Sequence, residues 1–296
     1  TLWVKGFDPS NPLNNSYEFQ ELRFTRCVFG VTSSPFHLLA TFRHHLSKYQ
    51  GSSPLIVQEI IDSMYVDDLV SGADTVQGAH NLFSQAKRML KEGGFNQRKF
   101  ATNSRELEVS LAGDEVLVDP KCITYAEITH PSIEQPRSSQ ELKVLGILWN
   151  RGEDKLVFCF DAFLAFAKST PYTRRGLLQL IARIYDPLGL LSPMMVPLKC
   201  ALQRACKLNL SWDCELPNEI CCLVKSWLRS LSEVGSFEFP RYCIEVDKSS
   251  IKSVQLIRFS DASELAFGGV FYVRVESDCG IQVNLFAARS RVAPIK

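Results

Sequence analysis

The hydrophobic pattern of the chain changes twice along its length, and this order limits the folds that the chain can adopt. Residues up to about 160 mix short apolar runs, which indicate strands, with stretches of helical period. Residues 173–231 carry three successive helical patterns, and from residue 254 onward strand-like runs return. We therefore expect an α+β fold in which a mixed region, a helical region and a β region follow one another.

The clearest single element is a helix over Thr75–Glu92, where apolar residues recur with a period of 3.6. We expect Asp74 at its N-terminal cap and Gly93–Gly94 at its end. Directly before it, two apolar runs flank a carboxylate pair within Met64–Val70, which predicts a tight hairpin with both acids at its tip. The other expected elements are strands over 22–29, 95–101 and 115–118, a helix ending near residue 49, a hairpin over 142–160, helices over 173–186, 192–208 and 216–231, and strands over 254–260, 267–275 and 283–288. We expect Phe36, Leu39, Phe42 and Leu46 on one face of the helix that ends near residue 49, and Thr173 at the N-terminal cap of the helix over 173–186.

Composition excludes several classes of protein. With 296 residues, 46% of them hydrophobic, and a net charge of +1, the chain is neither disordered, collagen-like nor a strongly basic coat protein. Its ten cysteines are too dilute for a disulfide scaffold, so we expect buried, reduced thiols. The most hydrophobic stretch, Leu188–Leu202, contains Lys199 and two prolines, and we expect no membrane span. The opening Thr1–Val4 resembles mid-domain sequence, so we expect a fragment of a longer protein.

The near-neutral total charge hides a separation of charge along the chain. Residues 1–119 carry a net charge of −3, whereas residues 168–207 carry seven basic residues against Asp186 alone, a net charge of +6. An acidic half beside a basic helical segment is suited to a metal site next to a surface that grips a polyanion. On charge alone, a solvated basic face is the favoured alternative.

The tetrapeptide Tyr65–Asp68 has a pattern that suits metal chemistry. Adjacent carboxylates repel each other, and a divalent cation such as Mg²⁺, which prefers hard oxygen ligands, removes that cost. With one further acid from a neighbouring strand, such a pair holds two metals for in-line phosphoryl transfer. An ordinary exposed acidic turn is the alternative interpretation.

Four further segments, taken with this tetrapeptide, carry a resemblance to a known family. They are Phe24–Phe36, Leu145–Trp149, Ile181–Pro193 and Arg289–Lys296. Through them the chain resembles the polymerase part of Bel/Pao-type long-terminal-repeat retrotransposon polyproteins, which are relatives of retroviral reverse transcriptases. The resemblance implies a partial polymerase palm with a two-stranded catalytic hairpin over residues 1–165, a helical thumb or connection over 166–245, and the opening strands of an RNase H-like domain over 246–296.

The resemblance also implies roles for individual residues. It implies two-metal nucleotidyl transfer with Mg²⁺ or Mn²⁺, an RNA template, a DNA primer and deoxynucleoside triphosphates. The implied catalytic metal ligands are Asp67 and Asp68 in the palm and Asp261 in the RNase H-like domain. The implied nucleotide-binding residues are Phe29, Gly30, Tyr65 and Lys99, and the implied template–primer contacts are Arg174, Arg175, Arg183 and Lys199.

Both implied active sites are incomplete in this chain. The first palm aspartate of the family lies upstream of the position that matches Leu2–Trp3, and the further RNase H carboxylates lie beyond Lys296. We therefore expect the chain alone to be inactive and to act with the remainder of the polyprotein. The expected setting is intracellular, in a cytoplasmic retroelement particle with a nuclear phase left open, and without a membrane.

Two other functions remain open at this point. Aspartic peptidase, a label attached to this region of Pao elements, requires an Asp-Ser/Thr-Gly string. The nearest strings are Asp74–Val76 and Asp261–Ser263, and neither contains the glycine. The other alternative is a non-catalytic remnant that holds nucleic acid without turnover.

Overall fold

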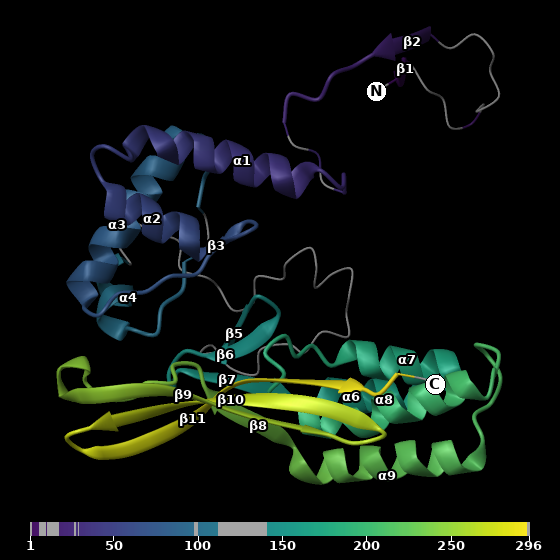
Figure 1. Ribbon diagram of the computed structural model, residues 1–296. Coiled ribbons are helices and arrows are strands. Elements are labelled where there is room, and N and C mark those ends of the chain that lie inside the picture. Colours follow the sequence, from purple (N-terminus) through teal and green to yellow (C-terminus); the bar gives the residue numbers. More distant parts are fainter. Residues whose placement is uncertain are drawn as a thin grey trace. The chain divides into compact units, whose positions relative to one another are not determined.

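The computed structural model describes residues 2–5, 10, 18–26, 28, 30–97, 100–111 and 141–294 (Figure 1). The chain divides into two compact units. The first consists of Thr1–Phe100 with Ser104–Leu117, and the second of Ala101–Asn103 with Val118–Lys296. The mixture of helices and sheets confirms the predicted α+β class.

The described part of the first unit contains helices and two short antiparallel hairpins. In chain order these elements are β1 (Leu2–Lys5), β2 (Glu18–Glu21), α1 (Ser34–Leu46), η1 (Ser47–Tyr49), α2 (Pro54–Ser63), β3 (Met64–Tyr65), β4 (Asp68–Leu69), α3 (Val76–Glu92) and α4 (Arg105–Leu111). Proline in the first turn of both α1 and α2 favours their starts, because proline has no amide hydrogen to leave unpaired there.

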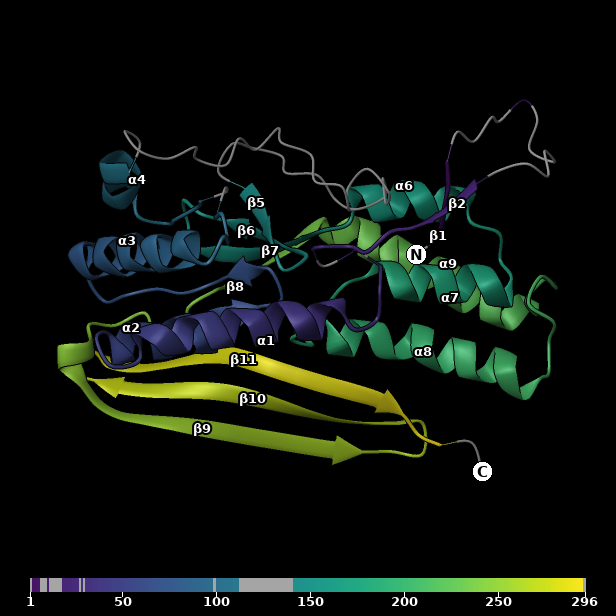
Figure 2. The same cartoon turned by 90° about the horizontal axis from the view of Figure 1, so that it is seen from above.

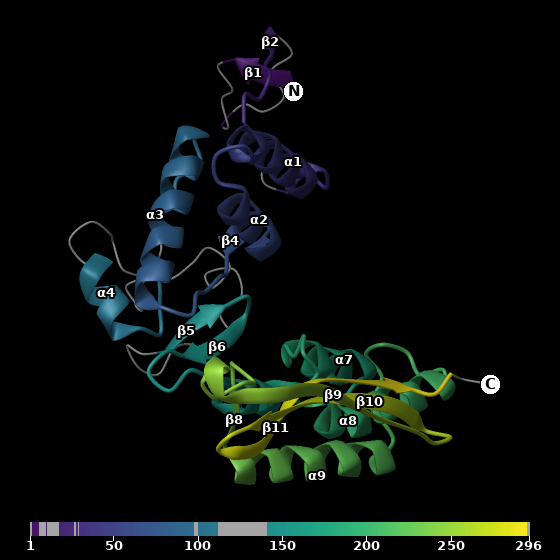
Figure 3. The same ribbon diagram turned by 60° about the vertical axis from the view of Figure 1, so that its left-hand side comes forward.

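Helices α1, α2 and α3 enclose the core of the first unit (Figure 3). Its buried residues come from one face of each helix: Phe42, Leu46, Val57, Ile60, Ala86, Met89 and Leu90. The C-terminal end of α3 is fixed by His45, whose buried ring nitrogen Nε2 lies 2.6 Å from the carbonyl oxygen of Met89. Gly93 leaves room for that ring, because an added Cβ would lie 2.6 Å from it. The double glycine therefore has a packing reason as well as a helix-stop reason.

The second unit contains two antiparallel sheets and a group of four α-helices within its described residues. In chain order these elements are β5 (Glu141–Val144), β6 (Ile147–Asn150), β7 (Lys155–Cys159), α6 (Asp161–Ser169), α7 (Arg174–Arg183), α8 (Ser192–Lys207), α9 (Asn218–Val234), β8 (Ser236–Pro240), η2 (Lys248–Ser250), β9 (Ile251–Ala262), β10 (Ala266–Ser277) and β11 (Gly280–Val292). One sheet has the order β5-β6-β7-β8, and the other has the order β11-β10-β9. Figure 2 shows the three long strands of the second sheet side by side.

A single large core joins the first of these sheets to helices α6–α9. It includes Phe158 from β7, Leu177 from α7, Leu198 from α8 and Val224 from α9, all at most 6% exposed. The second sheet is attached to the helices through β11, which packs against α8. The backbone amide of Ala288 donates to the carbonyl of Leu188 over 2.9 Å, so β11 also pairs with the loop between α7 and α8.

That loop, Tyr185–Leu191, is held rigidly by its own side chains and by its neighbours. The Asp186 carboxylate accepts hydrogen bonds from the amides of Leu190 (2.9 Å) and Leu191 (2.8 Å). Gly189 has φ +73°, and an added Cβ would lie 1.7 Å from the carbonyl oxygen of Ala288. On the hairpin β5–β6, Gly146 (φ +87°) packs under the ring of Tyr185. The loop therefore connects the hairpin, the helices and the last sheet.

Most of the expected helices form, with local differences. The N-cap of α3 is Thr75 rather than Asp74, because the Thr75 hydroxyl accepts a 3.0 Å hydrogen bond from the amide of Gly78. The predicted N-cap Thr173 of α7 is confirmed, with its hydroxyl 3.1 Å from the amide of Gly176. At the start of α1, Phe36 does not belong to a buried face of the helix, because its side chain is 71% exposed.

Two predicted strands are wrong in their described parts. Residues 22–26 are irregular, because Leu22 and Phe24 are 44% and 63% exposed and bury no apolar face that a strand would supply. Phe95–Gln97 is also irregular, and Phe100 makes only an isolated bridge. The strand predicted near 115–118 lies outside the described residues. The domain boundaries predicted at 165 and 245 stay predictions. Within the described part of the chain, no helix has the length and apolar character of a membrane span.

Candidate active site

The hairpin predicted around the carboxylate pair is present. Strands β3 and β4 pair antiparallel, with Met64 opposite Leu69 and Tyr65 opposite Asp68. Because side chains alternate across a strand, the two pairs face opposite ways. Met64 and Leu69 pack against the core of α1–α3, whereas Tyr65 and Asp68 are exposed. The apolar pair therefore anchors the hairpin and leaves the polar pair in solvent.

The turn of this hairpin consists of Val66 and Asp67, so the two acids occupy different positions. Asp67 lies in the turn, and Asp68 is the first residue of β4, not a second turn residue as the sequence predicted. Val66 has φ +55°, a left-handed conformation that is unfavourable for a β-branched side chain. Such conformations cost on the order of 1–3 kcal/mol and concentrate at functional sites. The strain lies directly beside the predicted metal ligand.

Helix α2 holds the base of the hairpin from both sides. The carboxylate oxygen Oε1 of Glu59 accepts a hydrogen bond from the Ser63 hydroxyl over 2.9 Å and another from the Ser71 hydroxyl. The amide of Val70 also donates to the carbonyl of Ser63 over 3.0 Å. Ser63 precedes β3 and Ser71 follows β4, so Glu59 ties the two strands together. Sequence reasoning missed this residue, although the spacing of four between Glu59 and Ser63 on a helix was available as a signal.

The hairpin supplies a donor set that suits a hard divalent cation. Asp67 and Asp68 are both exposed, and both offer carboxylate oxygens. Mg²⁺ is commonly bound through one or two carboxylates, with waters and substrate phosphates completing its six ligands. Among the residues that the structure describes, no group of three or more His, Cys, Asp or Glu side chains is arranged to hold a metal ion. Two carboxylates fit the metal as a partial site that needs further ligands.

The predicted nucleotide-binding residues are only partly described. Gly30 lies in the turn before α1 with φ +83°, and nothing lies within 4 Å of the position of an added Cβ. That turn is closed by the Ser34 hydroxyl, which donates to the carbonyl of Val28 over 2.6 Å. Tyr65 is 61% exposed on the hairpin. Phe29 and Lys99 lie outside the described residues.

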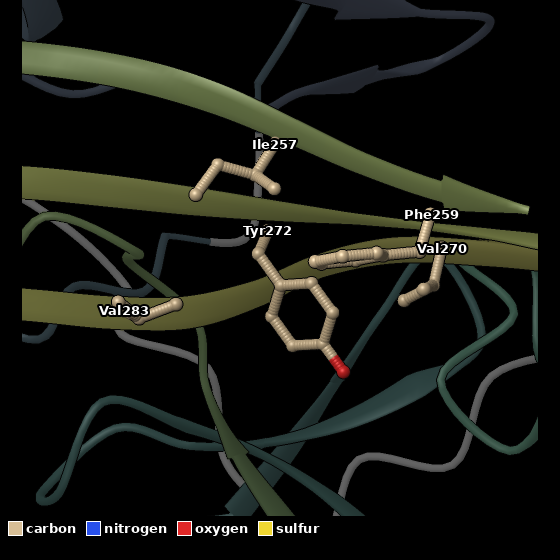
Figure 4. A pocket seen from close by; sticks show the side chains of 5 residues that line it. All are labelled: Ile257, Phe259, Val270, Tyr272 and Val283. Atoms are coloured by element: carbon tan, nitrogen blue, oxygen red, sulfur yellow. The ribbon is translucent and has the colours of Figure 1, made fainter.

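The predicted RNase H aspartate belongs to the second unit. Asp261 is exposed near the end of β9, opposite Gly268 of β10, and one of its carboxylate oxygens accepts from the amide of Ala262 over 2.8 Å. On the same sheet face lies an open apolar hollow of about 460 Å³ (Figure 4). Its lining is formed by Ile257, Phe259, Val270, Tyr272 and Val283.

The structure shows what the predicted template–primer residues contact in the chain itself. The Arg175 guanidinium makes two hydrogen bonds to the Asp213 carboxylate, of 2.7 Å and 3.0 Å, and these bonds lower the pKa of Asp213. Arg174 stacks over the ring of Trp212, 4.2 Å from its centroid, and donates to a backbone carbonyl.

The other two predicted contacts lie on α7 and α8. Arg183 lies 3.4 Å from the ring centroid of Phe166, although it is exposed. Lys199 is half-buried on α8, and it makes no ion pair within the described part of the chain. The net charge of +6 for residues 168–207 therefore overstates the free positive charge on these helices, because Arg175 and Arg204 are paired with Asp213 and Glu219 outside that segment.

Comparison with known proteins gives a family match in the C-terminal part of the chain. Residues 173–296, from the start of α7 through β11, match the family described as Pao retrotransposon-like RNaseH-like domain. The match supports a Pao-type retrotransposon pol region, and the final antiparallel sheet is consistent with an RNase H-like domain. The matched residues do not include the carboxylate hairpin, and the match gives no support for a peptidase. No curated protein matches the chain.

Proposed function

We propose, from the Pao-type character of residues 173–296, that the chain is part of an RNA-directed DNA polymerase whose metal ligands include Asp67 and Asp68. The observation that supports this proposal best is the strained turn at Val66, φ +55°, which presents two exposed carboxylates on an otherwise well-anchored hairpin. A turn with no function would gain stability from glycine or asparagine at that position. A valine at position 66 is explained if the hairpin is selected for the two carboxylates that it presents.

In this proposal the residues of the hairpin have separate roles. Asp67 and Asp68 would hold Mg²⁺ or Mn²⁺, which supplies positive charge for phosphoryl transfer between a primer end and a deoxynucleoside triphosphate. Glu59 is a positioning residue, because its bonds to Ser63 and Ser71 fix the spacing of the strands that carry both acids. Tyr65, cross-strand from Asp68, would border the nucleotide.

The partners and setting follow from the same proposal. The chain would bind an RNA template and a DNA primer and would act together with the remainder of a pol polyprotein, in a cytoplasmic retroelement particle. Lys199 and Arg183 would contact the template–primer, since neither is held by a carboxylate within the described residues. Asp261 would be the first metal ligand of the RNase H-like domain, which needs further carboxylates.

A metal-binding measurement on this chain tests the hairpin without requiring turnover. We expect Mn²⁺, followed by its electron paramagnetic resonance signal, to bind at least tenfold more weakly to Asp67→Asn and Asp68→Asn than to the unaltered chain. Asp62→Asn is the matched control, because Asp62 is an exposed acid one turn before the hairpin that pairs with Gln58. Equal Mn²⁺ binding in all four proteins would contradict the proposal.

Primer extension provides a second measurement. With Mg²⁺, a primed RNA template and deoxynucleoside triphosphates, we expect no detectable incorporation by this chain alone. Two-metal chemistry requires a third carboxylate, and among the described residues no third one joins the pair on the hairpin. Robust incorporation that is abolished by Asp67→Asn would keep the polymerase assignment and overturn the need for a third acid. Robust incorporation that survives this substitution would overturn the assignment of the hairpin.

A further inference from the structure

At the end of the β9–β11 sheet formed by residues 258–262, 267–271 and 287–291, one face carries three arginines and no acidic residue. The strand register places three rows of residues across this face. Arg258 is opposite Phe271, Ser260 is opposite Gly269, and Ala262 is opposite Phe267, while the third strand contributes Ala287, Arg289 and Arg291 to the same rows. These nine residues are called the arginine face. Asp261 lies on the other face, because it neighbours Ser260 along the strand.

The charges on the arginine face are available to a ligand. Arg258, Arg289 and Arg291 are all exposed, and the structure gives none of the three a carboxylate partner among the residues that it describes. The arginines of the opposite face and the helices differ in this respect. Arg274 pairs with Glu276 over 3.1 Å, and Arg175 pairs with Asp213 over 2.7 Å. Along the chain, Asp261 is three residues from Arg258 but lies on the other face, and the exposed Glu264 lies in the turn between β9 and β10.

The shape of the arginine face suits an extended polyanion. Arg289 and Arg291 are separated by two residues of one strand, about 6.8 Å, and Arg258 lies two strands away, about 10 Å across the sheet. Between them the floor is made of Ser260, Ala262 and Gly269, whose side chains are small. The small side chains of these three residues leave room for an extended chain to approach the sheet between the charged groups.

The face also offers an aromatic surface. Phe267 is 45% exposed, and it lies in the same row as Arg291 and Ala262. Basic side chains combined with exposed aromatic rings are the features by which proteins hold single-stranded nucleic acid, through phosphate contacts and base stacking. On a surface that binds duplex DNA through its phosphates alone, an exposed phenylalanine would have no unpaired base to stack on.

We propose that the arginine face binds a single-stranded segment of nucleic acid, with Arg258, Arg289 and Arg291 contacting phosphates and Phe267 stacking on a base. This site is distinct from the carboxylate hairpin, and binding to it requires no divalent metal. Failure of metal binding at Asp67 therefore leaves this inference standing, and failure of this inference leaves the hairpin assignment standing.

The test measures binding of a fluorescent 12-nucleotide single strand to the full chain by anisotropy, in EDTA and over a series of salt concentrations. For the triple variant Arg258→Gln/Arg289→Gln/Arg291→Gln we expect at least tenfold weaker binding near 0.1 M salt. We also expect the slope of log K against log salt to fall by about 2, because each phosphate contact with a single strand contributes about 0.7. Arg274→Gln is the control: it removes an arginine from the opposite face of the same sheet.

Two further variants separate charge, stacking and folding. The triple Arg→Lys variant keeps the charge, and we expect it to keep the salt slope of the unaltered chain. Phe267→Leu keeps an apolar residue in the strand, and we expect about tenfold weaker binding with an unchanged slope. Circular dichroism of each variant shows whether the sheet is retained.

Several outcomes would overturn the inference. These are unchanged affinity and slope in a folded triple Gln variant, equal losses in Arg274→Gln, and a loss for an RNA–DNA duplex while single-strand binding is unchanged. Competition by polyglutamate as effective as that by unlabelled oligonucleotide would indicate an acidic protein partner instead, and would also overturn it.

Discussion

Substitution of Gly189 by alanine tests how the close contact between the α7–α8 loop and β11 contributes to stability. An alanine Cβ at this position would lie 1.7 Å from the carbonyl oxygen of Ala288, a distance that real Cβ atoms do not show. Either the loop or β11 must move by more than about 1 Å, which breaks the 2.9 Å hydrogen bond from the Ala288 amide to the Leu188 carbonyl. Losing that bond costs about 1 kcal/mol. The left-handed φ of +73° adds roughly 1–2 kcal/mol for a residue with a Cβ.

The magnitude follows from comparison with a matched glycine. Gly235 in the same unit has φ +78°, but nothing lies within 4 Å of its added Cβ, so Gly235→Ala carries the backbone cost alone. We expect Gly189→Ala to destabilise the second unit by about 2–3 kcal/mol and Gly235→Ala by about 1–2 kcal/mol, a difference of about 1 kcal/mol from the lost hydrogen bond. For a unit of this size, the difference corresponds to a melting temperature lower by roughly 2–4 °C.

Urea unfolding followed by tryptophan fluorescence measures this difference. Three of the four tryptophans, Trp149, Trp212 and Trp227, belong to the second unit, so their emission mainly reports its unfolding. The reasoning is refuted if the two alanine variants lose equal stability, because the close approach of Gly189 to β11 would then carry no energetic weight.

Three other substitutions probe contacts elsewhere in the chain. Burial raises the pKa of Asp154. Hydrogen bonds from Arg241 and the Trp149 indole lower this pKa by more than burial raises it, so the net shift is downward. Asp154→Asn should cost about 1 kcal/mol at pH 7, and this difference should shrink below about pH 4, as acid titration of urea midpoints would reveal. Replacing Glu59 with glutamine should speed amide hydrogen exchange at Val70 without changing the melting temperature. Unchanged exchange at Val70 would contradict the positioning role of Glu59. Thr173→Ala should destabilise α7 by about 1 kcal/mol through loss of its cap, with thermal melting as the measurement.

The sequence predicted the elements that depend on neighbouring residues. The helix over Val76–Glu92 and the hairpin at Met64–Leu69 follow from apolar period and from turn chemistry, both of which act within a few residues. The prediction of a strand over 22–29 was wrong, because a short apolar run does not specify which strand it pairs with. Within the candidate active site, the sequence located Asp67 and Asp68, but it placed both in the turn.

The tertiary structure decided the environment of those residues. The strain at Val66 and the hydrogen bonds of Glu59 depend on the packing of α2 against the hairpin, which the pattern of residue types does not predict. Likewise, the charge count of residues 168–207 left out Asp213, which lies 38 positions from Arg175 along the chain and pairs with it through the fold.

What the sequence determined by itself is therefore local: helical periods, capping hydroxyls, the carboxylate pair and the motifs that resemble a retroelement polymerase. Only the tertiary structure decided which glycine lies against a strand about a hundred residues later, which arginines are already paired, and that Arg258 shares a sheet face with Arg289 and Arg291. The physical reason is that caps and periods are satisfied within one or two turns of chain. Contacts across a sheet or between a loop and a distant strand depend on register and packing, which many sequences of the same pattern could satisfy differently.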